Sequence, residues 1–168
     1  MKELVLIRHA KSDWGNEGLR DIDRHLNERG YDDAYLLSKW YLKHQTLPEL
    51  VVSSTATRAI ATALIFVRGI NLEMDHFIID ERIYESSVHT LLKVIKEQDD
   101  SLSSLMLVGH NPSITDLCNH LAGDLYFDNV PTCGIISFQV DVDRWPDLAP
   151  GNCKNSYHHY PRNFRNKN

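Results

Sequence analysis

Apolar runs alternate with polar, helix-like segments along this chain, and the runs predict the strands of a sheet. Residues 4–7 are four apolar residues in a row, and residues 105–108 are four more. A continuous run of this kind is typical of a strand buried on both faces of a parallel sheet. Shorter runs at 50–53 and 77–79 predict two further strands, and the alternating segment 134–141 predicts the last one.

The segments between these strands have apolar residues at helical spacing. Ala34, Leu37 and Tyr41, for example, would share one helix face, with Asn27 in the favoured N-cap position. The spacing predicts four helices, over about 28–44, 57–67, 88–97 and 113–121. Strands that alternate with helices predict an α/β fold, a three-layer α/β/α sandwich with a mainly parallel central sheet.

The length of 168 residues suits a single domain, which we place at residues 1–150. Residues 151–168 are expected to form a polar, basic C-terminal tail. From Lys154 onward the chain has no acidic residue and four basic ones, Lys154, Arg162, Arg165 and Lys167. Two interpretations stay open, a mobile terminus, which we favour, or an arm that meets an acidic partner.

Composition narrows the class of protein. No apolar stretch approaches the ~18 residues of a membrane span, and the N-terminus lacks a signal-peptide pattern, so a cytoplasmic location is expected. Three cysteines without a CxxC spacing suit a reducing compartment. The net charge of −5 argues against a nucleic-acid partner. No extended apolar surface stripe is evident, which favours a monomer.

Reactive side chains follow three of the predicted strands. Arg8 and His9 come directly after the first strand, Arg58 opens the helix after the second, and His110 follows the fourth. Open α/β sheets bind ligands at the carboxyl ends of their strands, so neighbouring strands would bring these groups into one pocket. A guanidinium group can bind phosphate oxygens through two parallel N–H···O hydrogen bonds, and an imidazole can attack phosphorus. The pattern therefore predicts a site for a phosphoryl group.

Five segments, in order over about residues 4–140, resemble the histidine phosphatase superfamily, and in particular its SixA-like phosphohistidine phosphatase branch. The segments are LIRHAKSDW (6–14), DRHLNERG (23–30), SSTATRA (53–59), VGHNP (108–112) and VPTCG (130–134). The resemblance implies the phosphoglycerate mutase-like fold. One departure is Arg24-His25-Leu26, where the branch usually has Arg-Pro-Leu.

The resemblance also implies roles. His9 would be the nucleophile that takes the phosphoryl group, and Arg8, Arg58 and His110 would complete the phosphate pocket. The family is metal-independent. No metal or other cofactor is expected here, because these side chains already supply positive charge. Glu85 is either the general acid or a solvated loop residue. The remaining candidates, all for substrate contact, are Lys11, Ser12, Asp21, Arg24 and Asn111.

The favoured substrate is a phosphohistidine-containing protein, since the chain lacks the insertions with which sugar-phosphate mutases enclose small substrates. Two alternatives stay open, a general phosphomonoesterase that acts on small metabolites and a phosphate-dependent binding module without turnover. Trp14 is also open to two interpretations, a contact to substrate or an aromatic lid over the first loop.

Overall fold

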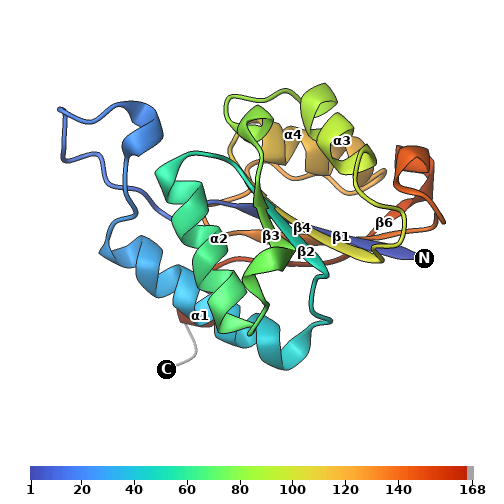
Figure 1. The fold of residues 1–168 in the computed structure, drawn as a ribbon, viewed down its shortest axis with the longest axis horizontal. Helices are drawn as coiled ribbons and strands as arrows, with labels where there is room; N and C mark the ends of the chain where they lie inside the picture. Colours follow the sequence, from blue (N-terminus) through green and yellow to red (C-terminus); the bar gives the residue numbers. More distant parts are fainter. Residues whose placement is uncertain (166–168) are drawn as a thin grey trace.

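One six-stranded sheet lies between two layers of helices in the structure, a computed structural model that describes residues 1–165 (Figure 1). The strands are β1 (Lys2–Arg8), β2 (Leu50–Ser53), β3 (Phe77–Ile79), β4 (Ser104–Gly109), β5 (Ile135–Val140) and β6 (Cys153–His159). Their order is β3-β2-β4-β1-β5-β6. The first four are parallel, whereas β5 runs antiparallel to β1, and β6 antiparallel to β5. The predicted fold class is confirmed.

The helices cover both faces of the sheet. They are α1 (Glu28–His44), α2 (Thr57–Gly69), α3 (Val88–Lys96), α4 (Ser113–Leu121) and the short α5 (Arg162–Arg165). Helices α1 and α2 lie on one face, and α3 and α4 on the other (Figure 1). Leu4 and Leu6 belong to the core under α3 and α4, while Val5 and Ile7 belong to the core under α1 and α2. None of the helices in the described part of the chain is long and apolar enough to cross a membrane.

The start of α1 is fitted closely to the loop that follows β1. The side chain of Asn27 accepts a hydrogen bond from Gly30 N at 2.8 Å, which is the predicted N-cap. Gly30 lies so near the loop that a Cβ atom there would be 2.1 Å from the backbone oxygen of Lys11. Only a glycine permits this approach, and it places the loop after β1 against the first turn of α1.

The prediction of a polar tail from residue 151 was wrong, because Cys153–His159 form β6 at the edge of the sheet. Strand β5 is therefore not the last strand. Trp40 of α1 helps to hold the segment, with its ring centroid 4.4 Å from that of His159 and 5.6 Å from that of Phe164. One expected tail residue, Lys167, lies outside the described residues.

Candidate active site

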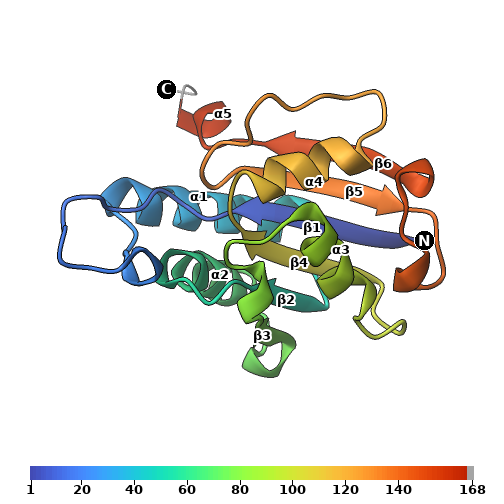
Figure 2. The same ribbon diagram turned by 90° about the horizontal axis from the view of Figure 1, so that it is seen from above.

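The sheet brings the three predicted strand ends together. Strand β4 lies between β1 and β2, and the carboxyl ends of all three meet at one edge (Figure 2). His9 N donates a hydrogen bond to Gly109 O at 3.0 Å, and Ser54 N donates one to Val108 O at 3.1 Å. The antiparallel β5 begins at the same edge, where Cys133 N donates to His9 O at 3.1 Å. The loop before β5 therefore joins the site as a fourth element.

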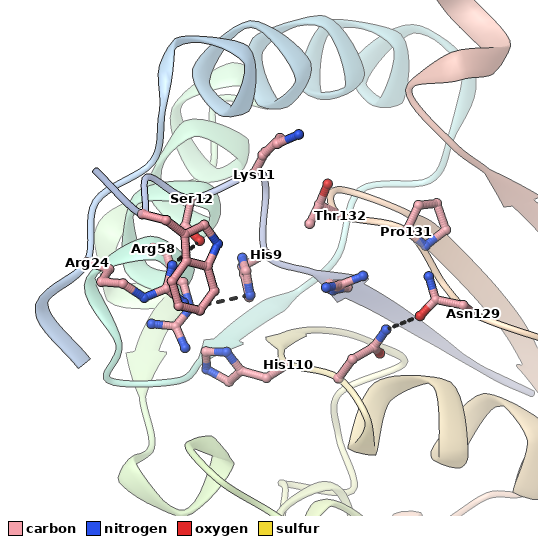
Figure 3. Close-up of a pocket in the computed structure, with 12 residues that line it drawn as sticks. His9, Lys11, Ser12, Arg24, Arg58, His110, Asn129, Pro131 and Thr132 are labelled. Atoms are coloured by element: carbon pink, nitrogen blue, oxygen red, sulfur yellow. Dashed lines mark hydrogen bonds between the residues drawn. The ribbon is translucent and has the colours of Figure 1, made fainter. Parts of the chain in front are cut away.

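A cavity of about 480 Å³ opens at this edge (Figure 3). Its lining contains every predicted site residue except Asp21 and Glu85. The lining residues are Arg8, His9, Lys11, Ser12, Trp14, Arg24, Arg58, His110, Asn111, Asn129, Pro131 and Thr132. Four of them are Arg or Lys and none is acidic, so the cavity favours an anion.

His9 is held in the form that a nucleophile needs. Its side chain is buried, and Nδ1 lies 2.7 Å from Ala10 O. Because a carbonyl oxygen only accepts, Nδ1 carries the ring hydrogen and Nε2 keeps its lone pair. Burial lowers the pKa of His9 to about 3, and the positive field of Arg58 and Arg8 adds to this lowering. The imidazole is therefore neutral at physiological pH.

Arg58 is fixed beside His9 by the short helical turn Asp21–Asp23. Its Nε lies 3.4 Å from His9 Nε2, while Nη1 donates to Asp21 O at 2.7 Å and Nη2 to Asp21 Oδ2 at 3.1 Å. The Tyr84 hydroxyl donates to the same Oδ2 at 2.6 Å. This bond and the two arginines Arg24 and Arg58 hold the pKa of Asp21 well below its usual range. We had expected Asp21 to contact substrate, but it does not line the cavity and instead supports Arg58 as an ionised carboxylate.

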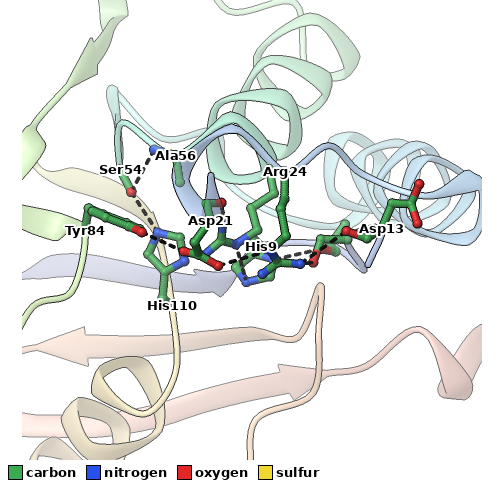
Figure 4. A network of polar contacts seen from close by, with 11 residues as sticks. His9, Asp13, Asp21, Arg24, Ser54, Ala56, Tyr84 and His110 are labelled. Carbon is green, nitrogen blue, oxygen red and sulfur yellow. Dashed lines mark hydrogen bonds and ion pairs between the residues drawn. The ribbon is translucent and has the colours of Figure 1, made fainter. Parts of the chain in front are cut away.

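His110 lies across from His9, with their ring centroids 5.1 Å apart. Its Nε2 is 2.7 Å from Ser54 Oγ, which already accepts a hydrogen bond from Ala56 N (Figure 4). When the Ser54 hydroxyl donates to Nε2, the ring hydrogen lies on Nδ1. Among the described residues Nδ1 has no hydrogen-bond partner. Burial lowers the pKa of His110 to about 4, with Arg58 adding to the effect. His110 is thus a neutral hydrogen-bond donor for an incoming anion.

Arg8 and Asn111 fix the loop before β5. Arg8 Nη1 and Asn111 Nδ2 both donate to Val130 O at 3.0 Å, and Asn111 Nδ2 also donates to Asn129 Oδ1 at 3.0 Å. Arg8 Nε is buried without a partner in the described part of the chain. Arg8 therefore still has hydrogen-bonding capacity to offer an anion, while its Nη1 holds Val130 in place.

Glu85 does not reach the cavity. Its side chain is exposed, and its backbone has a φ of 51°, in the left-handed region. The neighbouring Tyr84 is the residue that turns inward, toward Asp21 and the ring of His110. The general-acid role of Glu85 has no support in this geometry.

Sequence reasoning missed several residues at the site. Asn129, Pro131 and Thr132 line the cavity, while Ser54 and Tyr84 support His110 and Asp21 from behind. The segment at 130–134 had been noted for its resemblance, and that was the available signal for Pro131 and Thr132. The metal-ligating side chains that come together in residues 1–165 are Glu73, Asp75 and His76, which are exposed and outside this cavity.

Comparisons with known proteins agree with this chemistry. Residues 4–94 match the model of the histidine phosphatase superfamily (branch 1). An uncharacterized protein of Mycobacterium tuberculosis is 31% identical over 165 residues, which cover 93% of this chain and 100% of the relative. This chain belongs to the histidine phosphatase superfamily. The first three of the five segments, which end at residue 59 and include Arg8, His9 and Arg58, fall inside the matched region, so the resemblance deduced from sequence is confirmed.

Solved structures of the superfamily superpose on nearly the whole chain. The candidate phosphohistidine phosphatase SixA from Agrobacterium tumefaciens has a TM-score of 0.81 at 28% identity and covers 95% of this chain and 98% of its own. The protein histidine phosphatase SixA complexed with tungstate has a TM-score of 0.81 at 19% identity, over 96% and 98% of the two chains, and shares the fold. Family and fold together support phosphatase activity for this protein.

Proposed function

We propose that this chain removes phosphoryl groups from phosphohistidine, carried on a protein, through a covalent phosphohistidine on His9. His9 Nε2 attacks phosphorus, a new P–N bond forms, and the P–N bond of the substrate breaks. The departing electron pair stays on the substrate ring nitrogen. Water then attacks the phosphorylated His9, which releases phosphate and returns the electron pair to Nε2.

The observation that carries this proposal is the pairing of a neutral nucleophile with a cationic, acid-free cavity. The lone pair of His9 Nε2 lies beside Arg58, in a lining that holds Arg8 and His110 as further donors. Fixed donors of this kind stabilise the charge on the equatorial phosphoryl oxygens in the transition state. The transfer step also breaks one bond between phosphorus and an imidazole nitrogen and forms another of the same kind, so this step is nearly thermoneutral.

The absence of an acid from the lining bears on the leaving group. An alkoxide is a strong base and needs a proton donor as it departs, but Glu85 is exposed and Asp21 is held ionised. A phosphorylated imidazole leaves as neutral imidazole once its second ring nitrogen carries a proton, and the free ring is a weak base with a pKa of ~6.5. The site is therefore better suited to phosphohistidine than to alkyl esters.

The first experiment compares phosphate release from a histidine-phosphorylated protein with release from an alkyl phosphomonoester such as phosphoserine. We expect fast release from the phosphohistidine, no release by His9→Ala, and an acid-labile phosphoenzyme that the variant does not form. Glu85→Gln should retain most of the activity on phosphohistidine. Preference for the ester, with loss of activity in Glu85→Gln, would overturn the proposal in favour of a general phosphomonoesterase.

A binding module would retain phosphorylated ligand without turnover in the same assay. Independence of metals is a further part of the proposal, and we expect a chelator to leave the rate unchanged. A cytoplasmic location and a monomeric state stay predictions from the sequence.

A further inference from the structure

Trp14 is an exposed aromatic residue at the mouth of the cavity. The residue is 75% exposed, yet it lines the cavity together with Ser12 and Arg24. It takes no part in either hydrophobic core of the described residues. Burial of apolar area thus contributes little to its placement, and another contact must hold it there.

Arg24 supplies that contact. Its guanidinium carbon lies 3.5 Å from the centroid of the Trp14 ring, which is a close cation–π stack. Arg24 is itself buried. Two hydrogen bonds fix its side chain, since Nη1 donates to Ser12 Oγ at 2.6 Å and Nε donates to Asp21 Oδ1 at 3.0 Å. One face of the indole therefore rests on a fixed guanidinium, while the residue as a whole stays largely exposed where it lines the cavity.

The other lining residues suit the phosphoryl group itself and not the molecule that carries this group. The inner part of the cavity offers cations and neutral donors, and the apolar surface comes from Trp14 and Pro131. A leaving group projects from phosphorus toward the mouth, because the nucleophile attacks from the opposite side in line. The exposed ring of Trp14, which lines the same cavity, is therefore available to a leaving group that emerges there.

We propose that Trp14, supported by Arg24, determines specificity by stacking on a planar ring that carries the phosphoryl group. The inference rests on the proposed function and deepens it, since in that reaction the ring is the imidazole of phosphohistidine. The enzyme then distinguishes a phosphoryl group on a ring nitrogen from the same group on a nitrogen without a ring.

Two small substrates test this directly. N-Phosphoimidazole and phosphoramidate both contain a P–N bond, but the second has no ring. The measurement is the ratio of kcat/KM for the ring substrate to that for phosphoramidate. Trp14→Ala should lower this ratio about three- to tenfold, the range expected from loss of one aromatic stack, mainly through a higher KM for the ring substrate. Trp14→Phe should restore most of the ratio, because it retains a stacking ring.

Tyr126→Ala is the matched control, since Tyr126 is also 75% exposed but lies outside the cavity lining. Its ratio should equal that of the unsubstituted protein. The inference is overturned if Trp14→Ala leaves the ratio unchanged, whether it lowers both activities equally or lowers neither. If the unsubstituted protein releases phosphate from the histidine-phosphorylated protein but from neither small substrate, a ring alone does not determine specificity and the inference is overturned. If it releases phosphate from none of the three, the proposed function itself fails.

Discussion

Single side chains at this site are fixed in one charge state by their surroundings. Burial and nearby arginines keep His9 and His110 neutral, while the Tyr84 hydroxyl and two arginines keep Asp21 ionised. Asp21 in turn raises the pKa of Tyr84 to about 12, so the phenol keeps its proton. The nucleophile is therefore ready without a separate base, because no proton has to be removed from Nε2 before attack.

The charge state of His9 can be observed directly. We expect the ring ¹⁵N signals of His9 to report a neutral imidazole with the hydrogen on Nδ1 throughout pH 5–8, since its pKa is about 3 and Nδ1 donates to Ala10 O. The measurement is a ¹⁵N-histidine NMR titration, in which His9→Ala identifies the signal. Titration of that signal with a midpoint near 6.5 would contradict the structure.

At the scale of elements, the sequence predicted the part of the site that follows the parallel strands. Strands β1, β2 and β4 are apolar because they are buried on both faces, and the polar residue after each run lies at the ligand edge. That rule was enough to place Arg8, His9 and His110 together. It could not find Asn129 or Thr132, because these precede an antiparallel strand, whose amino end meets the same edge.

Strand β6 could not be predicted for a different reason. Its sequence, Cys-Lys-Asn-Ser-Tyr-His-His, has no apolar run, since it is an edge strand with alternating exposure. What makes it a strand is pairing with β5 and packing on Trp40, both of which are contacts distant in sequence. The inward turn of Tyr84, which leaves Glu85 outside, likewise depends on partners remote in the chain, Asp21 and His110.

The C-terminal helix α5 is anchored by one ion pair, which gives a prediction at this scale. Arg165 Nη2 is hydrogen-bonded to Asp33 of α1, whose side chain is only 4% exposed. Arg165→Met leaves that carboxylate buried with Arg29 at 4.0 Å as its remaining charged partner. We expect the free energy of unfolding to fall by about 1–3 kcal/mol, measured by urea denaturation.

Arg162→Met is the control, because Arg162 belongs to the same helix but is exposed. Its effect should stay within ~0.5 kcal/mol. In an Asp33→Leu background Arg165→Met should cost much less than it does alone, since the buried charge is gone. Equal losses for Arg162→Met and Arg165→Met would mean that the ion pair does not anchor α5.

For the whole molecule, the two neutral histidines link the stability of the fold to pH. In the unfolded chain both would take up a proton near pH 6.5, whereas in the fold their pKa values are about 3 for His9 and about 4 for His110. Between the folded and unfolded pKa values of each histidine, the unfolded state therefore binds more protons than the folded state. Stability therefore falls as the pH falls from 6.5 toward 4, by about 1.4 kcal/mol per pH unit for each histidine once its unfolded form is fully protonated.

This dependence can be separated from that of the carboxylates, because the pKa of Asp21 is lowered and its contribution is lost only at more acidic pH. We expect the unfolding free energy from urea titrations at pH 6.5, 5.5 and 4.5 to fall steeply for the unsubstituted protein. His9→Asn and His110→Asn should each remove part of that slope, and the double variant should remove most of it, whatever their stabilities at pH 6.5. If the double variant kept the full slope, the protons taken up on unfolding would belong to other groups, and the two imidazoles at the site would not be held neutral by the fold.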